Sequence, residues 1–389
     1  MLFRVGILAA LRSKRLDGKT IGVMVTASHN PEHVSVSCTP KATHSRTTQD
    51  NGVKLVDPRG EMLESSWESH ATVLANASST DELISALHDL IKIAKIDVSK
   101  PARVVYARDT RPSGPALVAA LEDGFKAMGA ETRNAGVTTT PLLHYLVRTI
   151  NTKGTKDSYG DDTEEGYYTK LSSAFNKLIV RASIFLYVPL HNTSDCQAGR
   201  PPRSPLVIDC ANGVGAPAAK ILSRYLQNSL PIELENTAID TSGALNNACG
   251  ADFVKVNQKL PPSLVNVLQP GQRACSLDGD ADRLMYFYLD ERRQFHMLDG
   301  DKITTLVASF IVDLVKAVSL EEELRVGVVQ TAYANGSSTK YLSAVCGIWH
   351  VSDCSMRLTV PVETTCQMRS DGREAFAPCS RAVRYRSIL

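Results

Sequence analysis

The sequence predicts an α/β protein in which mixed or parallel β-sheets are covered by helices. Several segments repeat one pattern, in which a short apolar strand leads into a polar or glycine-containing loop and then an amphipathic helix. A helix is also expected at residues 302–317, where apolar residues recur at helical spacing along one face. The length of 389 residues allows two or three domains, each with an apolar core.

The first expected element is a helix that contains "VGILAAL", residues 5–11. The same stretch could form the core of a signal peptide. Basic residues follow it at once and no small-x-small cleavage site is present, so a helix of a folded domain is favoured. Residues 20–31, "TIGVMVTASHNP", predict a strand that leads into a loop, and residues 50–57, "DNGVKLVD", predict a turn and a second strand.

Later segments continue the alternation of strands and helices. They are residues 102–114 with the helix that follows them, residues 205–226, residues 284–289 and residues 324–342. Three segments break the pattern because they have no sustained apolar period: residues 33–49, residues 181–204 and the tail from residue 346 onward.

Composition excludes several classes of protein. The net charge is +2, so the chain has no broad basic field for nucleic acid, and no apolar run is long enough to span a membrane. The nine cysteines include no C-x-x-C pair and no cluster at zinc spacing. These features favour a cytoplasmic protein with reduced thiols.

The acidic loop in "CSLDGDADRLMYFYLD" is the most specific chemical feature. Asp278, Asp280 and Asp282 alternate along an extended loop, so their side chains can converge on one divalent cation, with Mg²⁺ preferred over Zn²⁺. An EF-hand is disfavoured because its sixth and twelfth positions would be Arg283 and Leu289. A solvated acidic turn is the remaining alternative, although the apolar strand that follows would anchor the loop.

Ser28 lies at the end of the strand in residues 20–31, where catalytic groups of such sheets often lie. A hydrolase pair of Ser28 and His29 is weakly supported, because adjacent residues on an extended chain point to opposite sides. A plain turn is the structural alternative. A phosphoryl group on Ser28 near the acidic loop would instead form a phosphoryl-transfer site, with Arg283 and Lys54 as neutralising cations.

The motifs "TASHNP", "DNGVKL", "RDTRPSG", "DGDADR" and "LDGDKI" occur in an order that resembles the α-D-phosphohexomutase superfamily. The segments "GVTTTPLLHYLVR", "EEGYYTKLSSAFNKL" and "CGADFVK" are similar to its phosphoacetylglucosamine mutase branch. The resemblance covers nearly everything from residue 1 to about residue 345, apart from the irregular segments.

The resemblance implies a phosphohexomutase-type multidomain α/β fold of four domains around a cleft. We expect residues 1–170 to form domain I with the phosphoserine loop, and residues 171–290 to form domain II with the magnesium loop. Residues 291–345 would form part of domain III, and residues 346–389 an unrelated tail. The third domain is thus expected to be incomplete and the fourth to be missing, with part of the apolar stripe of residues 302–317 left uncovered.

The resemblance also implies an isomerase that interconverts N-acetylglucosamine 6-phosphate and N-acetylglucosamine 1-phosphate, the step before UDP-N-acetylglucosamine synthesis. Ser28 would be the phosphoserine, and a sugar bisphosphate would be both intermediate and activator. The metal ligands would be Ser28, Asp278, Asp280 and Asp282, which would hold Mg²⁺. Arg283 would steady the phosphate, while His29 and Lys54 would line the pocket, with Lys54 assisting proton transfer.

Departures from the family pattern qualify these expectations. The segment at residues 33–49 falls between Ser28 and Lys54, and the family's later phosphate-binding loop is not found in the chain. We therefore expect that Ser28 can in principle transfer a phosphoryl group, while mutase turnover by this chain is severely impaired or absent. The alternatives are a phosphoglucomutase or phosphomannomutase, or a non-catalytic fragment with a binding or regulatory role. The sequence leaves the oligomeric state open.

Overall fold

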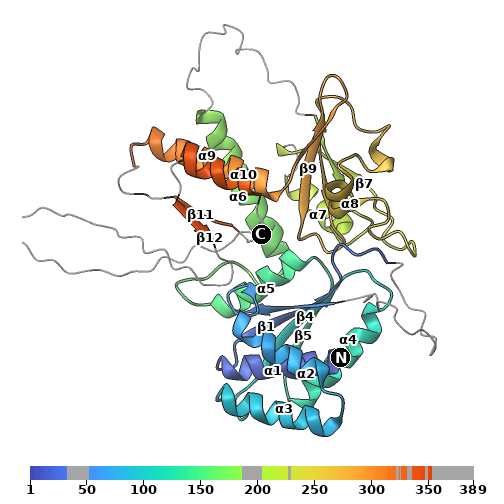
Figure 1. The fold of residues 1–389 in the computed structure, drawn as a ribbon, viewed down its shortest axis with the longest axis vertical. Helices are drawn as coiled ribbons and strands as arrows, with labels where there is room; N and C mark the ends of the chain where they lie inside the picture. Colours follow the sequence, from blue (N-terminus) through green and yellow to red (C-terminus); the bar gives the residue numbers. More distant parts are fainter. Residues whose placement is uncertain are drawn as a thin grey trace, which may run out of the picture. The chain divides into compact units, whose positions relative to one another are not determined.

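The computed structural model describes residues 1–32, 52–185, 204–226, 229–320, 324, 326–330, 335–346 and 349–352 (Figure 1). The chain forms two compact units, Met1–Met297 and Leu298–Leu389. The irregular segment at residues 33–49 lies outside the described residues, as does most of the tail after residue 345.

The first unit contains two sheets, and the first of these has the strand order β3-β2-β1-β4-β5. Its strands are β1 (Thr20–Val25), β2 (Val53–Asp57), β3 (Glu61–Met62), β4 (Arg103–Arg108) and β5 (Glu131–Val137). Strands β1, β4 and β5 are parallel, whereas β2 is antiparallel to β1 and β3 is antiparallel to β2. The predicted mixed sheet is therefore present, with β1 at its centre.

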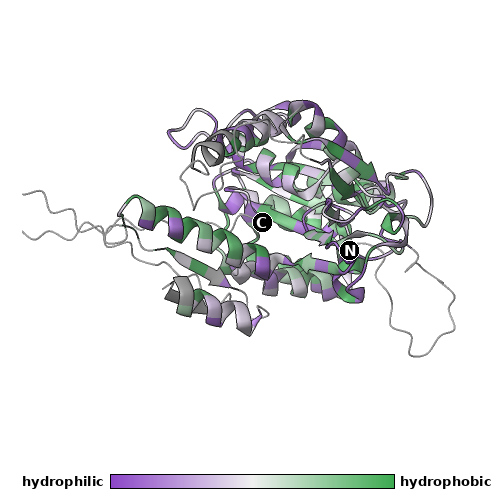
Figure 2. Ribbon diagram, turned by 90° about the horizontal axis from the view of Figure 1, so that it is seen from above, coloured by the Kyte–Doolittle hydropathy of each residue, from purple (hydrophilic) through white to green (hydrophobic). Residues whose placement is uncertain are grey.

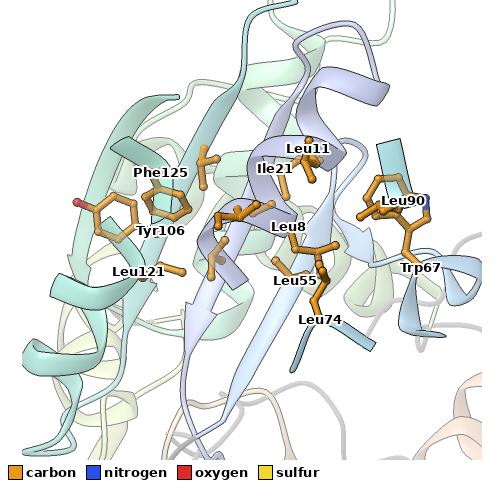
Figure 3. Close-up of a cluster of buried hydrophobic side chains, with 14 of the residues drawn as sticks. Leu8, Leu11, Ile21, Leu55, Trp67, Leu74, Leu90, Tyr106, Leu121 and Phe125 are labelled. Carbon is orange, nitrogen blue, oxygen red and sulfur yellow. The ribbon is translucent and has the colours of Figure 1, made fainter. Parts of the chain in front are cut away.

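Helices cover both faces of this sheet (Figure 1). They are α1 (Leu2–Arg15), α2 (Glu68–Asn76), α3 (Thr80–Ile93), α4 (Gly114–Ala127) and α5 (Thr140–Thr152). Because strand side chains alternate, Ile21, Val23 and Val25 of β1 pack in one apolar cluster with α1 to α4, while Met24 packs with α5 on the opposite face. Figure 3 shows the larger cluster, in which Leu8 and Ile21 lie between the sheet and its helices.

Helices α1 and α4 cross at two glycines. A Cβ atom on Gly6 would lie 2.4 Å from the carbonyl oxygen of Leu121, and one on Gly124 would lie 2.2 Å from that of Phe3. The backbones of the two helices are therefore in direct contact, which a larger residue at either position would prevent. The helix predicted from "VGILAAL" is α1, and it is a buried element of the domain core.

The second sheet has the order β10-β9-β8-β6-β7. Its strands are β6 (Leu206–Asp209), β7 (Ile232–Glu235), β8 (Arg273–Leu277), β9 (Leu284–Leu289) and β10 (Phe295–Leu298). Helix α8 (Gly250–Asn257) packs with Val207 on one face, and helix α7 (Gly215–Leu226) packs with Ile208 on the other. Figure 2 shows apolar residues in green along the central strands and hydrophilic residues in purple on outer turns.

Helix α6 (Glu164–Phe185) corrects one expectation from the sequence. The irregular segment was expected to begin at residue 181, but the helix continues through Phe185. The rest of that segment, up to residue 203, lies outside the described residues. Over the part of the chain that is described, every helix is too short or too polar to cross a bilayer.

The second unit contains α9 (Gly300–Ala317), β11 (Gly327–Gln330), α10 (Gly336–Cys346) and β12 (Trp349–Ser352). Ala308 and Val312 of α9 pack with Leu342 of α10, whereas Leu306 and Phe310 of the same stripe are exposed. Strand β12 pairs in parallel with β11, and the alternation therefore continues one strand beyond residue 345.

Candidate active site

Ser28 lies three residues beyond the buried strand β1, in a tight turn. Its backbone is left-handed with φ = 53°, its N–H donates to Thr26 Oγ1 at 2.9 Å, and Asn30 N donates to the carbonyl of Ala27 at 3.1 Å. A left-handed serine is strained by about 1–2 kcal/mol, so the surrounding contacts must hold it. Strain of this kind is common at functional sites.

The acidic loop connects β8 to the antiparallel strand β9 and folds around Asp278. Asp278 Oδ1 accepts the N–H groups of Asp282 at 3.1 Å and Arg283 at 3.2 Å. Asp278 and Asp280 are fully buried, and Asp282 is partly buried. One carboxylate oxygen from each of the three lies within 4.8 Å of the others, so the convergence predicted from their alternation is present.

The serine turn and the acidic loop meet although they belong to different sheets. Ser28 Oγ donates to Asp278 Oδ2 at 2.6 Å, across 250 positions of sequence. Gly279 makes this approach possible, because a Cβ atom at that position would lie 2.7 Å from the carbonyl oxygen of Ser28. The hydroxyl is therefore within reach of any cation that the three carboxylates hold.

Lys54 is brought to the acidic loop by β2, in which it pairs with Met24 of β1. Its Nζ donates to Asp280 Oδ2 at 2.6 Å and to Asp282 Oδ2 at 2.5 Å. Burial lowers the pKa of Lys54, but the charges of Asp280 and Asp282 and their hydrogen bonds outweigh burial, so the pKa is raised above its ordinary value. Lys54 is therefore an ammonium cation at neutral pH.

The pKa values of Asp278 and Asp280 are shifted in opposite directions. Burial and the charge of Asp280 raise the pKa of Asp278. Burial also raises the pKa of Asp280, but the Lys54 ammonium and the hydrogen bonds from Lys54 and Thr140 lower it below its ordinary value overall. Three converging carboxylates that repel one another are stabilised by a divalent cation among them.

Two carboxylate oxygens of this cluster are available to bind a metal. Asp280 Oδ1 and Asp282 Oδ1 are buried and have no hydrogen-bond partner in the described part of the chain. Carboxylate and hydroxyl oxygens are the donor set that Mg²⁺ prefers. The residues present therefore fit a magnesium ion.

Arg283 and His29 lie at the edge of the same cluster. Arg283 Nε is 3.9 Å from Asp278 Oδ2, and its side chain is half exposed. His29 is partly buried, its Nδ1 has no partner among the described residues, and burial together with the Arg283 charge lowers its pKa. At neutral pH the site thus combines a neutral imidazole with two cations, Lys54 and Arg283.

Three residues of the site were not predicted from the sequence. Thr140 Oγ1 donates to Asp280 Oδ2 at 2.5 Å, and Thr140 N donates to the Asp280 carbonyl at 3.0 Å. Arg111 and Asn246 both donate to backbone carbonyls of the serine turn. The "TTTP" signal identifies the start of α5, where Thr139 caps the helix, but not the loop that this helix end contacts.

Family models match most of the chain. Residues 73–155 match phosphoglucomutase/phosphomannomutase α/β/α domain I. Residues 157–285 and 299–355 match domains II and III of phosphoacetylglucosamine mutase AMG1. The acidic loop lies in the range 157–285, which matches domain II.

Individual relatives agree with these matches. Phosphoacetylglucosamine mutases from Sus scrofa and Homo sapiens are 47% and 46% identical over 345 residues, which is 89% of this chain and 56% of each relative. The chain therefore spans little more than half the length of these curated relatives. Aspergillus fumigatus N-acetylphosphoglucosamine mutase, solved with GlcNAc-6P and magnesium, is 44% identical with a TM-score of 0.74 over 89% of this chain and 58% of that one.

A second solved relative is covered more fully. It is the apo-form of an N-acetylglucosamine-phosphate mutase of the α-D-phosphohexomutase superfamily, 43% identical with a TM-score of 0.72. The match covers 89% of this chain and 67% of that chain. The fold, the acidic loop and these matches together place the chain in the phosphoacetylglucosamine mutase family of the α-D-phosphohexomutases.

Proposed function

We propose that this chain carries the phosphoserine and magnesium machinery of a phosphoacetylglucosamine mutase, with Ser28 as the residue that gains and loses the phosphoryl group. The observation that carries the proposal is the 2.6 Å contact between Ser28 Oγ and Asp278, within a cluster of three converging carboxylates. A plain serine turn would need no such cluster beside it.

The reaction interconverts N-acetylglucosamine 6-phosphate and N-acetylglucosamine 1-phosphate. A sugar hydroxyl attacks the phosphorus on Ser28, the bond to Ser28 Oγ breaks, and the sugar becomes a bisphosphate. After the sugar turns over, Ser28 Oγ takes the other phosphoryl group back. A hexosamine or glucose bisphosphate would activate the enzyme by phosphorylating Ser28, and an Aspergillus fumigatus relative was solved with glucose 1,6-bisphosphate.

The acidic and basic side chains around Ser28 have different proposed roles. Asp278, Asp280 and Asp282 would hold Mg²⁺ together with the Ser28 oxygen, and the ion would neutralise charge on the phosphoryl group. Arg283 lies at the edge of the cluster, where its guanidinium can bind a phosphate oxygen.

Proton transfer needs a group near the attacking sugar hydroxyl. The neutral imidazole of His29 can accept a proton, because burial lowers its pKa. Lys54 begins as an ammonium and can act only as a proton donor in that form. We therefore assign Lys54 to charge neutralisation and proton donation.

The cytoplasm is the compartment that we propose for this reaction, as a step toward UDP-N-acetylglucosamine. The described cysteines Cys210, Cys249 and Cys275 are buried free thiols, which suits a reducing compartment. The substrates are small sugar phosphates, and neither nucleic acid nor a membrane is required.

Intact-mass spectrometry of the purified chain tests the proposal. Incubation with glucose 1,6-bisphosphate and Mg²⁺ should add one phosphoryl group, which peptide mapping should locate at Ser28. Ser28→Ala should abolish the addition, whereas Ser66→Ala, at an exposed serine, should leave it unchanged. A parent chain whose Ser28 stays bare under these conditions would favour the non-catalytic alternative.

The same preparation identifies the sugar. N-acetylglucosamine 6-phosphate should remove the phosphoryl group from Ser28 faster than glucose 6-phosphate or mannose 6-phosphate does. Faster removal by either of the other sugars would favour a phosphoglucomutase or a phosphomannomutase.

A further inference from the structure

The backbone carbonyls of the serine turn are held by two buried side chains from different sheets. Asn246, in the segment between β7 and α8, donates from Nδ2 to the carbonyl of Ser28 at 2.9 Å and to that of Asn30 at 3.2 Å. Arg111, which follows β4, donates from Nη2 to the same carbonyls at 3.4 Å and 2.6 Å. We propose that Asn246 and Arg111 are positioning residues that hold Ser28 Oγ in line with the acidic loop.

The serine turn needs such support because its conformation is unfavourable. Ser28 has a left-handed backbone and is buried, so its carbonyl oxygen has little access to water. A buried carbonyl without a donor is destabilising, and a serine without restraint prefers right-handed or extended backbone. Loss of the donors therefore allows the turn to relax, which moves the hydroxyl away from Asp278.

Arg111 closes a ring of hydrogen bonds around the Ser28 backbone. Its Nε donates to Asp109 Oδ2 at 3.1 Å, and Asp109 Oδ2 also accepts from Thr26 Oγ1 at 2.8 Å. Thr26 Oγ1 in turn accepts the Ser28 N–H at 2.9 Å. The side chains of Arg111 and Asp109 are fully buried, so both sides of the Ser28 peptide are fixed by one network that water does not reach.

Asn246 connects the serine turn to the loop that carries the carboxylates. Its backbone N–H donates to the Ala211 carbonyl at 2.9 Å, and its own backbone is left-handed with φ = 55°. A Cβ atom on Gly279 would lie 2.8 Å from Asn246 Nδ2 and 2.7 Å from the Ser28 carbonyl oxygen. The amide therefore packs directly against the acidic loop while it holds Ser28.

The positioning role predicts a specific kinetic effect, and it rests on the proposed phosphorylation of Ser28. Asn246→Gly removes the side-chain amide, and with it both hydrogen bonds from Nδ2, at a backbone conformation that suits glycine. Asn246→Asp keeps the shape of the side chain but replaces the donor nitrogen with an oxygen. With glucose 1,6-bisphosphate and Mg²⁺, both variants should phosphorylate Ser28 at least tenfold more slowly at saturation. The half-saturating bisphosphate concentration should change less than threefold, because the buried Asn246 amide is engaged by the Ser28 and Asn30 carbonyls.

Asn247→Ala is the matched control. The Asn247 side chain is exposed and donates to the Gly243 carbonyl at 3.2 Å within its own loop. Its phosphorylation rate should stay within twofold of the parent rate. Equal slowing of the Asn246 and Asn247 variants would overturn the inference. So would Asn246 variants that change only the half-saturating bisphosphate concentration and not the rate at saturation.

Hydrogen–deuterium exchange of the metal-free chain provides a measurement that does not depend on phosphorylation. Peptides that cover residues 26–32 should exchange at least fivefold faster in Asn246→Gly than in the parent, while peptides of β4 and β8 should be unchanged. Faster exchange across the whole first unit, or no change in the turn, would overturn the positioning role. If the parent chain is not phosphorylated but the turn exchanges faster in the variant, the proposed function fails and the positioning of the turn stands.

Discussion

Gly279→Ala is the substitution that tests whether close backbone contact positions Ser28. The added methyl group would lie 2.7 Å from the Ser28 carbonyl oxygen, 2.8 Å from Asn246 Nδ2 and 3.1 Å from Leu245 Cδ1. The backbone of Gly279 does not have a positive φ, so an alanine there is not strained. The effect of the substitution comes from crowding alone. Ordinary contact begins near 3.4 Å, and the serine turn must therefore retreat by about 0.6–0.7 Å.

This displacement is large on the scale of the hydrogen bond between Ser28 and Asp278. Ser28 Oγ and Asp278 Oδ2 are 2.6 Å apart, and a retreat of that size would lengthen the contact to roughly 3.2 Å, beyond the range of an O–H···O bond. Overpacking of a buried site costs about 1–3 kcal/mol of unfolding free energy. Misplacement of a reacting group by less than 1 Å can slow chemistry by roughly tenfold or more.

Urea denaturation and intact-mass kinetics measure the two effects on the same preparation. We expect the unfolding free energy of Gly279→Ala to fall by about 1–3 kcal/mol and Ser28 phosphorylation to slow by about tenfold or more. Gly300→Ala is the control, because among the described residues outside its own chain neighbours no atom lies within 4 Å of the added methyl group, and it should change neither quantity. Normal stability and a normal phosphorylation rate in Gly279→Ala would refute the argument that backbone contact positions Ser28.

Three further predictions concern charge and packing. Lys54→Met should lower the unfolding free energy by about 1–3 kcal/mol in metal-free buffer, because it leaves Asp280 and Asp282 without their cation, and Mg²⁺ should restore part of the loss in thermal melts. Gly124→Ala should destabilise the chain by about 2 kcal/mol or more, because its methyl group would clash with the backbone of α1. Mg²⁺ affinity measured by calorimetry should not change, because this contact involves none of the three carboxylates. Burial and the charge of Asp280 raise the pKa of Asp278 from 3.8 to about 7, so the folded chain binds this proton more tightly than the unfolded chain. Stability in metal-free buffer should therefore fall by at least about 1 kcal/mol as pH rises through that window, and Asp278→Asn should remove this slope in urea titrations.

The sequence predicted the chemistry of the acidic loop better than its surroundings. Three aspartates at alternate positions indicate a shared cation, because converging carboxylates repel one another unless positive charge lies among them. Strand periodicity also placed Ser28 and Lys54 at or near strand ends, and β1 and β2 are found where residues 20–31 and 50–57 predicted them. Local pattern is sufficient for these features because they depend on neighbouring residues.

The partners of Ser28 could not be predicted in the same way. Asn246 lies 218 positions from Ser28, and nothing in its neighbours indicates a donor for that turn. Arg111 belongs to a recognisable motif, but its motif does not reveal that the guanidinium faces the carbonyls of Ser28 and Asn30. Such contacts are set by how the two sheets pack, and a single sequence contains no direct record of that packing.

The glycines of the site show why this packing matters for function. A Cβ atom on Gly213 would lie 2.4 Å from the Gly279 carbonyl oxygen, just as one on Gly279 would lie 2.7 Å from that of Ser28. Close backbone contacts thus connect three segments, from the loop after β6 through the acidic loop to the serine turn. The hydroxyl of Ser28 and the carboxylate of Asp278 extend from two of these segments. The 2.6 Å contact between them therefore requires the two backbones to approach closely. Any side chain inserted at Gly213 or Gly279 should therefore impair phosphoryl transfer even though neither glycine supplies a reacting group.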